Sequence, residues 1–165
     1  MKKLLSVLLL LALIAFIPAL AEGYADTNCN SVLRAGDVYA SPSLSAAKVG
    51  QVGYLELVRV LYFDGDFAYI TFRRGSDETH VNGFFPWRNL EYVYGAAGYM
   101  LASTPVYSDL SARSGKTGKV AGNEIVCIIY SDDEDFYYIN YYNASKHSIE
   151  GGYVPARLVY EFPNV

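Results

Sequence analysis

Residues 57–72 read LVRVLYFDGDFAYITF, and this stretch predicts a β-hairpin. Two runs rich in β-branched and aromatic residues flank the turn Asp64-Gly65-Asp66, which is the usual composition of two antiparallel strands and their connection. Side chains alternate between the two faces of a strand. We therefore expect the alternate residues from Ala68 to Phe72 to point into the core, whereas Phe67 and Tyr69 lie on the outer face or cover an end of the sheet.

The same pattern recurs at residues 125–142 as IVCIIYSDDEDFYYINYY. It belongs to a longer internal repeat, in which positions between 38 and 62 match positions 68 residues later and positions between 67 and 88 match positions 69 residues later. One extra residue in the acidic turn explains the change of offset, and the matches keep their order from end to end. We interpret the chain as two copies of one strand-rich unit.

Units of roughly 65 residues are suited to small, compact barrels. Aromatic residues make up 15% of the chain, which favours strands. The predicted fold is all-β, with a signal peptide at residues 1–21, an N-terminal arm at 22–30 and two domains at 31–94 and 95–165. We expect the small residues Gly95-Ala96-Ala97-Gly98 to form the linker, and a linker this short implies that the units touch.

Short motifs recur in both copies in the same order. The first copy has VYASPS at 38–43, KVGQV at 48–52 and GFF at 83–85, and the second has VYSD at 106–109, KTGKV at 116–120 and GYV at 152–154. Together with the central hairpin, these motifs resemble the bacterial SH3 (SH3b) family. The resemblance implies two tandem SH3-like small β-barrels after an N-terminal signal-peptide helix. The sequence departs from the family pattern at Phe67, Phe84, Phe136 and Tyr153, where tryptophan is frequent.

Domains of that family dock onto envelope or cell-wall components, commonly the peptide part of peptidoglycan. The resemblance therefore implies a non-catalytic binding protein whose partner is peptidoglycan or an envelope protein or peptide. The alternative is a protein–protein interaction module, such as an inhibitor or adaptor of a separate envelope enzyme. A small hydrolase is a third alternative, which the sequence supports least.

The N-terminus predicts export. Lys2 and Lys3 are followed by an apolar run from Leu4 to Ile17, a proline, and the small residues Ala19 and Ala21, which is the organisation of a cleavable signal peptide. An uncleaved membrane anchor is the alternative, but the proline interrupts the run. We expect a protein that is secreted or held in the cell envelope, with no stable membrane insertion after cleavage.

Charge excludes some partners. Cleavage removes two lysines and leaves 11 basic residues against 17 acidic residues, a net charge of −6. Nucleic acid and anionic lipid are therefore not expected partners, and no cofactor is predicted.

No set of residues has the spacing of a catalytic or metal site. We interpret His80 and His147 as solvated loop residues. Cys29 and Cys127 lie outside recognisable nucleophile motifs. Because Cys127 matches Arg59, which should face outward, the two cysteines are expected either to form a disulfide in an oxidising compartment or to stay as separate thiols, with Cys127 packed between the barrels.

Two loop motifs have simple interpretations. The acidic run Asp132-Asp133-Glu134-Asp135 lacks the spacing of a calcium loop and is expected to be a solvated hairpin turn. Asn143-Ala144-Ser145 matches a glycosylation acceptor, but we interpret it as a turn.

Aromatic residues at strand ends and turns are the candidate ligand-binding residues, because such side chains stack on sugars or pack against peptides. The alternative is that most of them close the cores or the contact between the barrels. Trp87 stands out because the second copy has Ala156 there, and we expect a shallow groove around Phe67, Phe84 and Trp87. The full candidate set is Tyr39, Tyr62, Phe67, Phe84, Trp87, Tyr107, Tyr130, Phe136 and Tyr153.

Overall fold

The computed structural model describes residues 28–75, 79–130 and 133–163. The predicted signal peptide, most of the predicted arm, and Ser131 and Asp132 of the acidic turn lie outside these residues. Within them the chain is all-β, as predicted, and forms two seven-stranded antiparallel sheets. Among the described residues, no helix is long and apolar enough to cross a membrane.

The first sheet has the strand order β3-β2-β6-β5-β4-β1-β7. Its strands are β1 (Cys29–Val32), β2 (Gly36–Tyr39), β3 (Lys48–Val52), β4 (Leu57–Asp64), β5 (Phe67–Arg74), β6 (Thr79–Pro86) and β7 (Leu90–Tyr92). A short 3-10 turn, η2 (Trp87–Asn89), connects β6 to β7.

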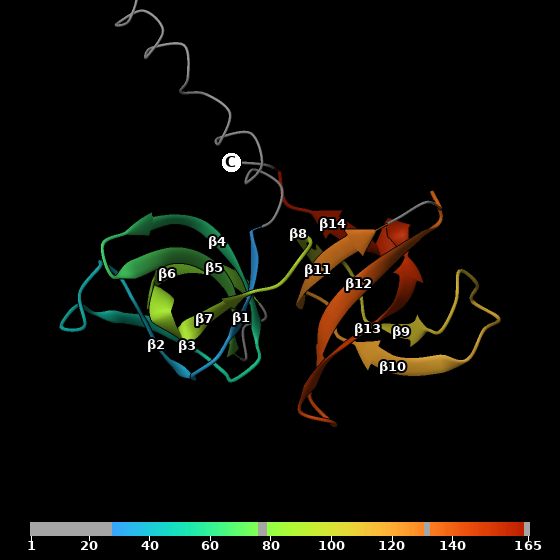
Figure 1. The fold of residues 1–165 in the computed structure, drawn as a ribbon, viewed down its shortest axis with the longest axis horizontal. Helices are drawn as coiled ribbons and strands as arrows, with labels where there is room; N and C mark the ends of the chain where they lie inside the picture. Colours follow the sequence, from blue (N-terminus) through green and yellow to red (C-terminus); the bar gives the residue numbers. More distant parts are fainter. Residues whose placement is uncertain (1–27, 76–78, 131–132, 164–165) are drawn as a thin grey trace, which may run out of the picture.

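The second sheet repeats this order as β10-β9-β13-β12-β11-β8-β14. Its strands are β8 (Ala96–Met100), β9 (Thr104–Tyr107), β10 (Lys116–Val120), β11 (Ile125–Tyr130), β12 (Phe136–Asn143), β13 (Ser148–Pro155) and β14 (Val159–Glu161). The 3-10 turn η3 (Ala156–Leu158) stands where η2 stands in the first sheet. Figure 1 shows the two sheets as curled bodies lying side by side, with β1 and β8 on the sides that face each other.

Each sheet curls around its own apolar core, as the alternation in the central hairpins predicts. Ala68, Ile70 and Phe72 are fully buried in the first core, and Ile139 and Tyr141 are fully buried in the second. Curling brings the outer strands close to the centre of the sheet. At Gly50 on β3, for example, a Cβ atom would lie only 2.6 Å from the Phe72 ring on β5.

The predicted linker is right at Gly95 and wrong at its other three residues. Ala96, Ala97 and Gly98 belong to β8, the strand next to the edge of the sheet, which pairs with both β11 and β14. Small residues are needed there for close packing, because a Cβ on Gly98 would lie 2.8 Å from the carbonyl oxygen of Tyr160. The connection between the sheets is therefore only residues 93–95. Cys29 and Asn30, which we assigned to the arm, are the first residues of β1.

Candidate functional site

Two rings pack edge to face at the same place in each sheet. Tyr39 and Phe67 have ring centroids 6.4 Å apart at an interplanar angle of 87°, and Tyr107 and Phe136 have centroids 6.3 Å apart at 86°. This geometry is a favoured one for aromatic pairs. The structure therefore brings these four candidate residues together in pairs that obey the repeat.

A second aromatic group lies across β4, β5 and β6. Tyr69 is its centre, with its ring centroid 5.0 Å from that of Tyr62 and 4.8 Å from that of Phe84. In the second sheet the matching rings of Tyr138 and Tyr153 are 5.0 Å apart. Sequence reasoning did not include Tyr69 and Tyr138 among the candidates, although their alternation with the core residues placed them on the same face as Phe67 and Phe136. The backbone of the remaining candidate, Tyr130, pairs with Tyr138.

Most of these rings are packed rather than open. Phe67 and Phe84 are each 9% exposed, whereas Tyr62 is 50% and Trp87 is 42% exposed. Trp87 lies on η2, where its backbone N–H donates to the Asp66 carbonyl oxygen at 3.2 Å and its ring lies under the Arg88 guanidinium. The accessible aromatic side chains of the first sheet at these positions are therefore those of Tyr62 and Trp87, and Phe84 packs against the ring of Tyr62.

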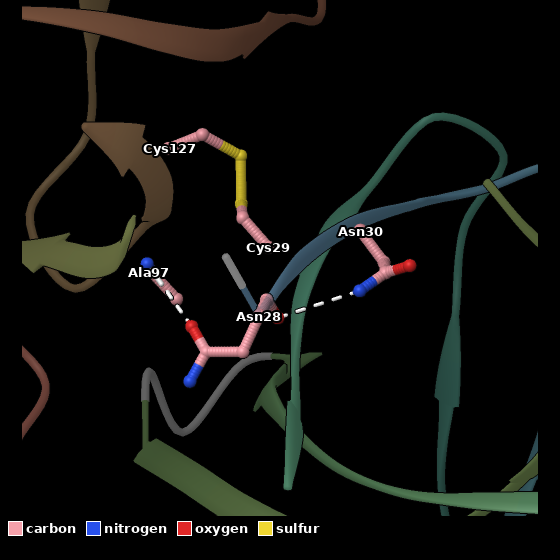
Figure 2. The surroundings of a disulfide bond; sticks show 5 residues. All are labelled: Asn28, Cys29, Asn30, Ala97 and Cys127. Atoms are coloured by element: carbon pink, nitrogen blue, oxygen red, sulfur yellow. Dashed lines mark hydrogen bonds between the residues drawn. A yellow bond between two sulfur atoms is a disulfide. The ribbon is translucent and has the colours of Figure 1, made fainter. Parts of the chain in front are cut away.

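A disulfide joins Cys29 on β1 to Cys127 on β11, which is one of the two arrangements considered for these residues. Their Cα atoms are 5.7 Å apart and both residues are fully buried. Figure 2 shows Asn28 beside the bond, with its side-chain oxygen accepting from the backbone N–H of Ala97 at 3.2 Å. The first strand of one sheet is thereby tied to the centre of the other, and neither cysteine presents a thiol.

The surfaces that meet between the sheets are equivalent surfaces of the repeat, and we call this contact the seam. Its buried residues include the matching pairs Cys29 with Ala97 and Leu57 with Ile125, together with Cys127. Val93 and Phe162 occupy matched positions and pack against this cluster. The backbone N–H of Val93 donates to the Cys29 carbonyl oxygen, and the backbone N–H of Phe162 donates to the carbonyl oxygen of Ala97, the residue that matches Cys29. Such a self-complementary contact is the arrangement found in twofold dimers.

Two expectations about polar residues are wrong because of the seam. Arg59 does not face solvent, since it is buried beneath the ring of Phe162 at 4.7 Å and donates a hydrogen bond to the Pro163 carbonyl oxygen. His80 is not a solvated loop residue. It lies in β6, and its Nε2 donates to the Asn123 carbonyl oxygen of the other repeat at 2.8 Å. Burial lowers the pKa of His80, so its neutral form is favoured.

The other polar candidates lie in turns or form local contacts. His147 is exposed, with its Nδ1 3.3 Å from the Tyr142 hydroxyl. Asn143 is the last residue of β12, and its buried side chain donates to Glu150 Oε2 on β13 at 2.9 Å. In the acidic run, Asp133 accepts from the Asp135 backbone N–H, as in a tight turn. No group of three or more potential metal ligands occurs among the residues that the structure describes.

The seam opens on one side into a cleft of about 590 Å³, which sequence reasoning missed and which we call the inter-sheet cleft. Its lining comes from both repeats, and most of its members are matched positions: Gly53 and Ala121, Glu56 and Glu124, Leu57 and Ile125, Arg73 and Tyr142, and Gly75 and Ala144. Its volume is within the range of small-molecule sites. The repeat had paired the two glutamates, but nothing in the sequence indicated that they would share a cleft.

Two carboxylates dominate the electrostatics of the inter-sheet cleft. Burial raises the pKa of both Glu56 and Glu124, and the Arg73 guanidinium partly opposes this for each. Glu56 Oε2 accepts from the Gly53 backbone N–H at 2.7 Å, and Glu124 Oε2 accepts from the Ala121 backbone N–H at 3.1 Å. The two side chains are thus held in the same way at equivalent turns, and their mutual repulsion contributes to the raised pKa of Glu56.

Comparisons with known proteins identify no family. No family model matches the chain, and no curated protein matches it. Among solved structures, it is similar to NlpC2 from Trichomonas vaginalis, at 19% identity and a TM-score of 0.35 over 83% of this chain and 49% of that chain. NlpC1 from the same organism matches at 18% identity and a TM-score of 0.35 over 87% of this chain and 49% of that chain. The chain spans about half the length of these structures, and likeness at this level carries no argument about function.

Proposed function

We propose that each seven-stranded sheet is an SH3-like barrel of the bacterial SH3 type, and that the chain is an exported, non-catalytic protein that binds peptidoglycan or another envelope component. The observation that carries the proposal is the aromatic arrangement at one face of each sheet. Tyr69 and Phe84 in the first sheet, and Tyr138 and Tyr153 at the matched positions of the second, have ring centroids 4.8 Å and 5.0 Å apart. Repetition of an aromatic platform favours a binding role over catalysis, which needs one reactive set of groups rather than two similar surfaces.

The first sheet has the more accessible platform. Tyr62 is about half exposed and contacts both Tyr69 and Phe84, and Trp87, which follows β6 on η2, is also about half exposed. Rigid aromatic rings contribute large contact area with little loss of side-chain entropy, so they are effective anchors for sugars and peptides. The second repeat has alanine in place of Trp87, so we assign the stronger binding to the first sheet.

A sedimentation assay with purified sacculi tests the proposal. We expect the mature protein to sediment with sacculi, and Trp87→Ala to reduce the bound fraction at least threefold without changing the melting temperature. The matched control is Tyr94→Ala, because Tyr94 is an exposed aromatic residue in the connection between the two sheets, away from the platform. Failure of the wild-type protein to sediment at any ionic strength would refute wall binding. Copurification of a stoichiometric protein partner in that case would support the adaptor alternative.

A further inference from the structure

The seam changes in character along the two strands that form its centre. The matched strands β4 and β11 lie against each other, and both begin at the inter-sheet cleft. Leu57 and Ile125, their first residues, are buried between the sheets. Two residues farther along, Arg59 and Cys127 are buried on the same side of their strands, as strand alternation requires. The cleft therefore marks the end at which the seam is open, and the disulfide lies farther inside.

Access to the disulfide depends on the contact between the sheets. Cys29 and Cys127 are both fully buried. Reduction requires direct attack on a sulfur atom, so the bond is out of reach while the sheets stay in contact. Opening the seam does not require either sheet to unfold, because all strands of each repeat pair within their own sheet. The rate of reduction therefore reports how often the seam opens.

Like charges meet at the open end of the seam. Glu56 and Glu124 directly precede β4 and β11, and each is held there by a hydrogen bond from the backbone of its own turn. Their carboxyl groups lose water where the sheets meet, and this desolvation is the largest cause of the raised pKa of each. The Arg73 guanidinium opposes it only partly, as one cation beside two carboxylates. An ionised pair thus favours a seam that admits water.

Other ionisable groups face the same end of the seam. His80 donates to the Asn123 carbonyl oxygen of the other repeat, next to Glu124, and burial lowers the pKa of His80. Protonation of His80 at low pH therefore opposes closure, whereas protonation of the glutamates favours it. The contribution of the glutamates is separated from the others by comparison with a variant that keeps all of them. The remaining ionisable residues that line the cleft or interact with the pair are Tyr54, Arg73, Tyr141, Tyr142 and His147.

We propose that the seam is a pH-sensitive gate over the disulfide. When Glu56 and Glu124 are ionised, the two sheets separate transiently at the cleft end, and a dithiol reaches the bond between Cys29 and Cys127. The two thiols of the reductant then form a disulfide, and their protons pass to the two cysteine sulfurs. When the glutamates are protonated, the seam stays closed and the bond is protected. This device goes beyond the proposed binding function and does not depend on it.

The rate of reduction by a water-soluble phosphine tests the proposal. The phosphine becomes a phosphine oxide with oxygen from water, and its own reactivity at each pH is calibrated on oxidised glutathione. The oxidised mature protein is compared with Glu124→Gln, in which glutamine keeps the acceptor for the Ala121 N–H but carries no charge. We expect the wild type to be reduced at least about threefold faster than the variant at pH 7.5, and at nearly the same rate at pH 4. Glu56→Gln should behave in the same way.

The matched control is Glu134→Gln, which makes the same change of net charge at an exposed residue of the β11–β12 turn, outside the cleft. It should be reduced like the wild type at every pH. A ratio of wild-type to Glu124→Gln rates that stays constant with pH would overturn the proposal, because it would indicate a merely structural role for the glutamate. Equal slowing in Glu134→Gln would also overturn it, as an effect of net charge. So would no detectable reduction of the wild type at pH 7.5, or reduction as fast as that of oxidised glutathione.

Discussion

Removing the disulfide is the sharpest test of how the two sheets are held together. We consider the double variant Cys29→Ala/Cys127→Ala, because both residues are fully buried in an apolar cluster and serine would bury hydroxyl groups there. The bond closes a loop with a sequence separation of 98 residues. In the chain-entropy treatment, a loop of this length stabilises the folded state by about 4.7 kcal/mol.

A loss of about 4.7 kcal/mol is a large part of the stability of a protein of this size. We expect the guanidinium midpoint of the double variant to fall accordingly and its melting temperature to drop by roughly 10–20 °C. The two sheets should also unfold less cooperatively, because the tie connects β1 of the first sheet to β11 of the second. Trp87 is the one tryptophan of the chain and reports on the first sheet, whereas far-UV circular dichroism reports on both.

The assay is equilibrium unfolding of the oxidised mature protein and the double variant, followed by both signals, with a thiol titration to confirm that the wild type is fully oxidised. The two signals should give one transition in the wild type and separated midpoints in the variant. A variant whose free energy of unfolding falls by less than about 1 kcal/mol would refute the reasoning, since the chain-entropy effect of the loop is several times larger.

Three further predictions concern packing and titration. Gly83→Ala should destabilise the first sheet by about 1–3 kcal/mol in chemical denaturation, because its Cβ would lie 2.9 Å from the Tyr39 carbonyl oxygen, whereas Gly115→Ala, where the nearest atom is 3.5 Å away, should have little effect. Burial raises the pKa of Glu124, so its contribution to the free energy of unfolding is largest at low pH and is lost as the pH rises through its folded pKa. Glu124→Gln removes the cost of a buried charge, so we expect it to increase the melting temperature relative to wild type more at pH 7.5 than at pH 4. Burial lowers the pKa of His80 below its ordinary value of 6.5, so the unfolded chain takes up a proton more readily and the folded state loses stability as the pH falls below that value. Between pH 7 and pH 5.5, the melting temperature of His80→Gln should therefore fall less than that of the wild type.

Local patterns were sufficient to predict the strands of the central hairpins and their core faces. The alternation from Ala68 to Phe72 is a two-residue period set by the backbone, and the fully buried side chains follow it. The repeat extended this prediction to the second sheet, where Ile139 and Tyr141 occupy the matching core positions. The same patterns placed Phe67 and Tyr69 on the opposite face, and the contact of Tyr69 with Phe84 follows from that placement together with the antiparallel register.

Long-range contacts explain what the sequence did not predict. Gly98 has the composition of a linker, but its small size serves a close approach to Tyr160, a residue far away in the chain. Arg59 has the polarity of an outward-facing residue, but the C-terminal residues Phe162 and Pro163 cover it. Strand alternation determines which side chains share a face, yet it contains no information on which face will meet another sheet. The seam and its cleft could therefore be found only from the three-dimensional structure.

The internal repeat also separates what the fold requires from what it does not. Each cleft glutamate accepts a hydrogen bond from its own turn, and this local role alone would explain its presence in a single unit. It does not explain why the two turns meet across an open space, because glutamine would satisfy the same backbone N–H without placing two like charges in a dehydrated cleft. At the matched position nearby, Arg73 and Tyr142 differ although the strands that carry them are equivalent, so the fold does not dictate either side chain. Both repeats thus keep a carboxylate where it costs stability, while the neighbouring matched position differs, so the two glutamates are not explained by the requirements of the fold alone.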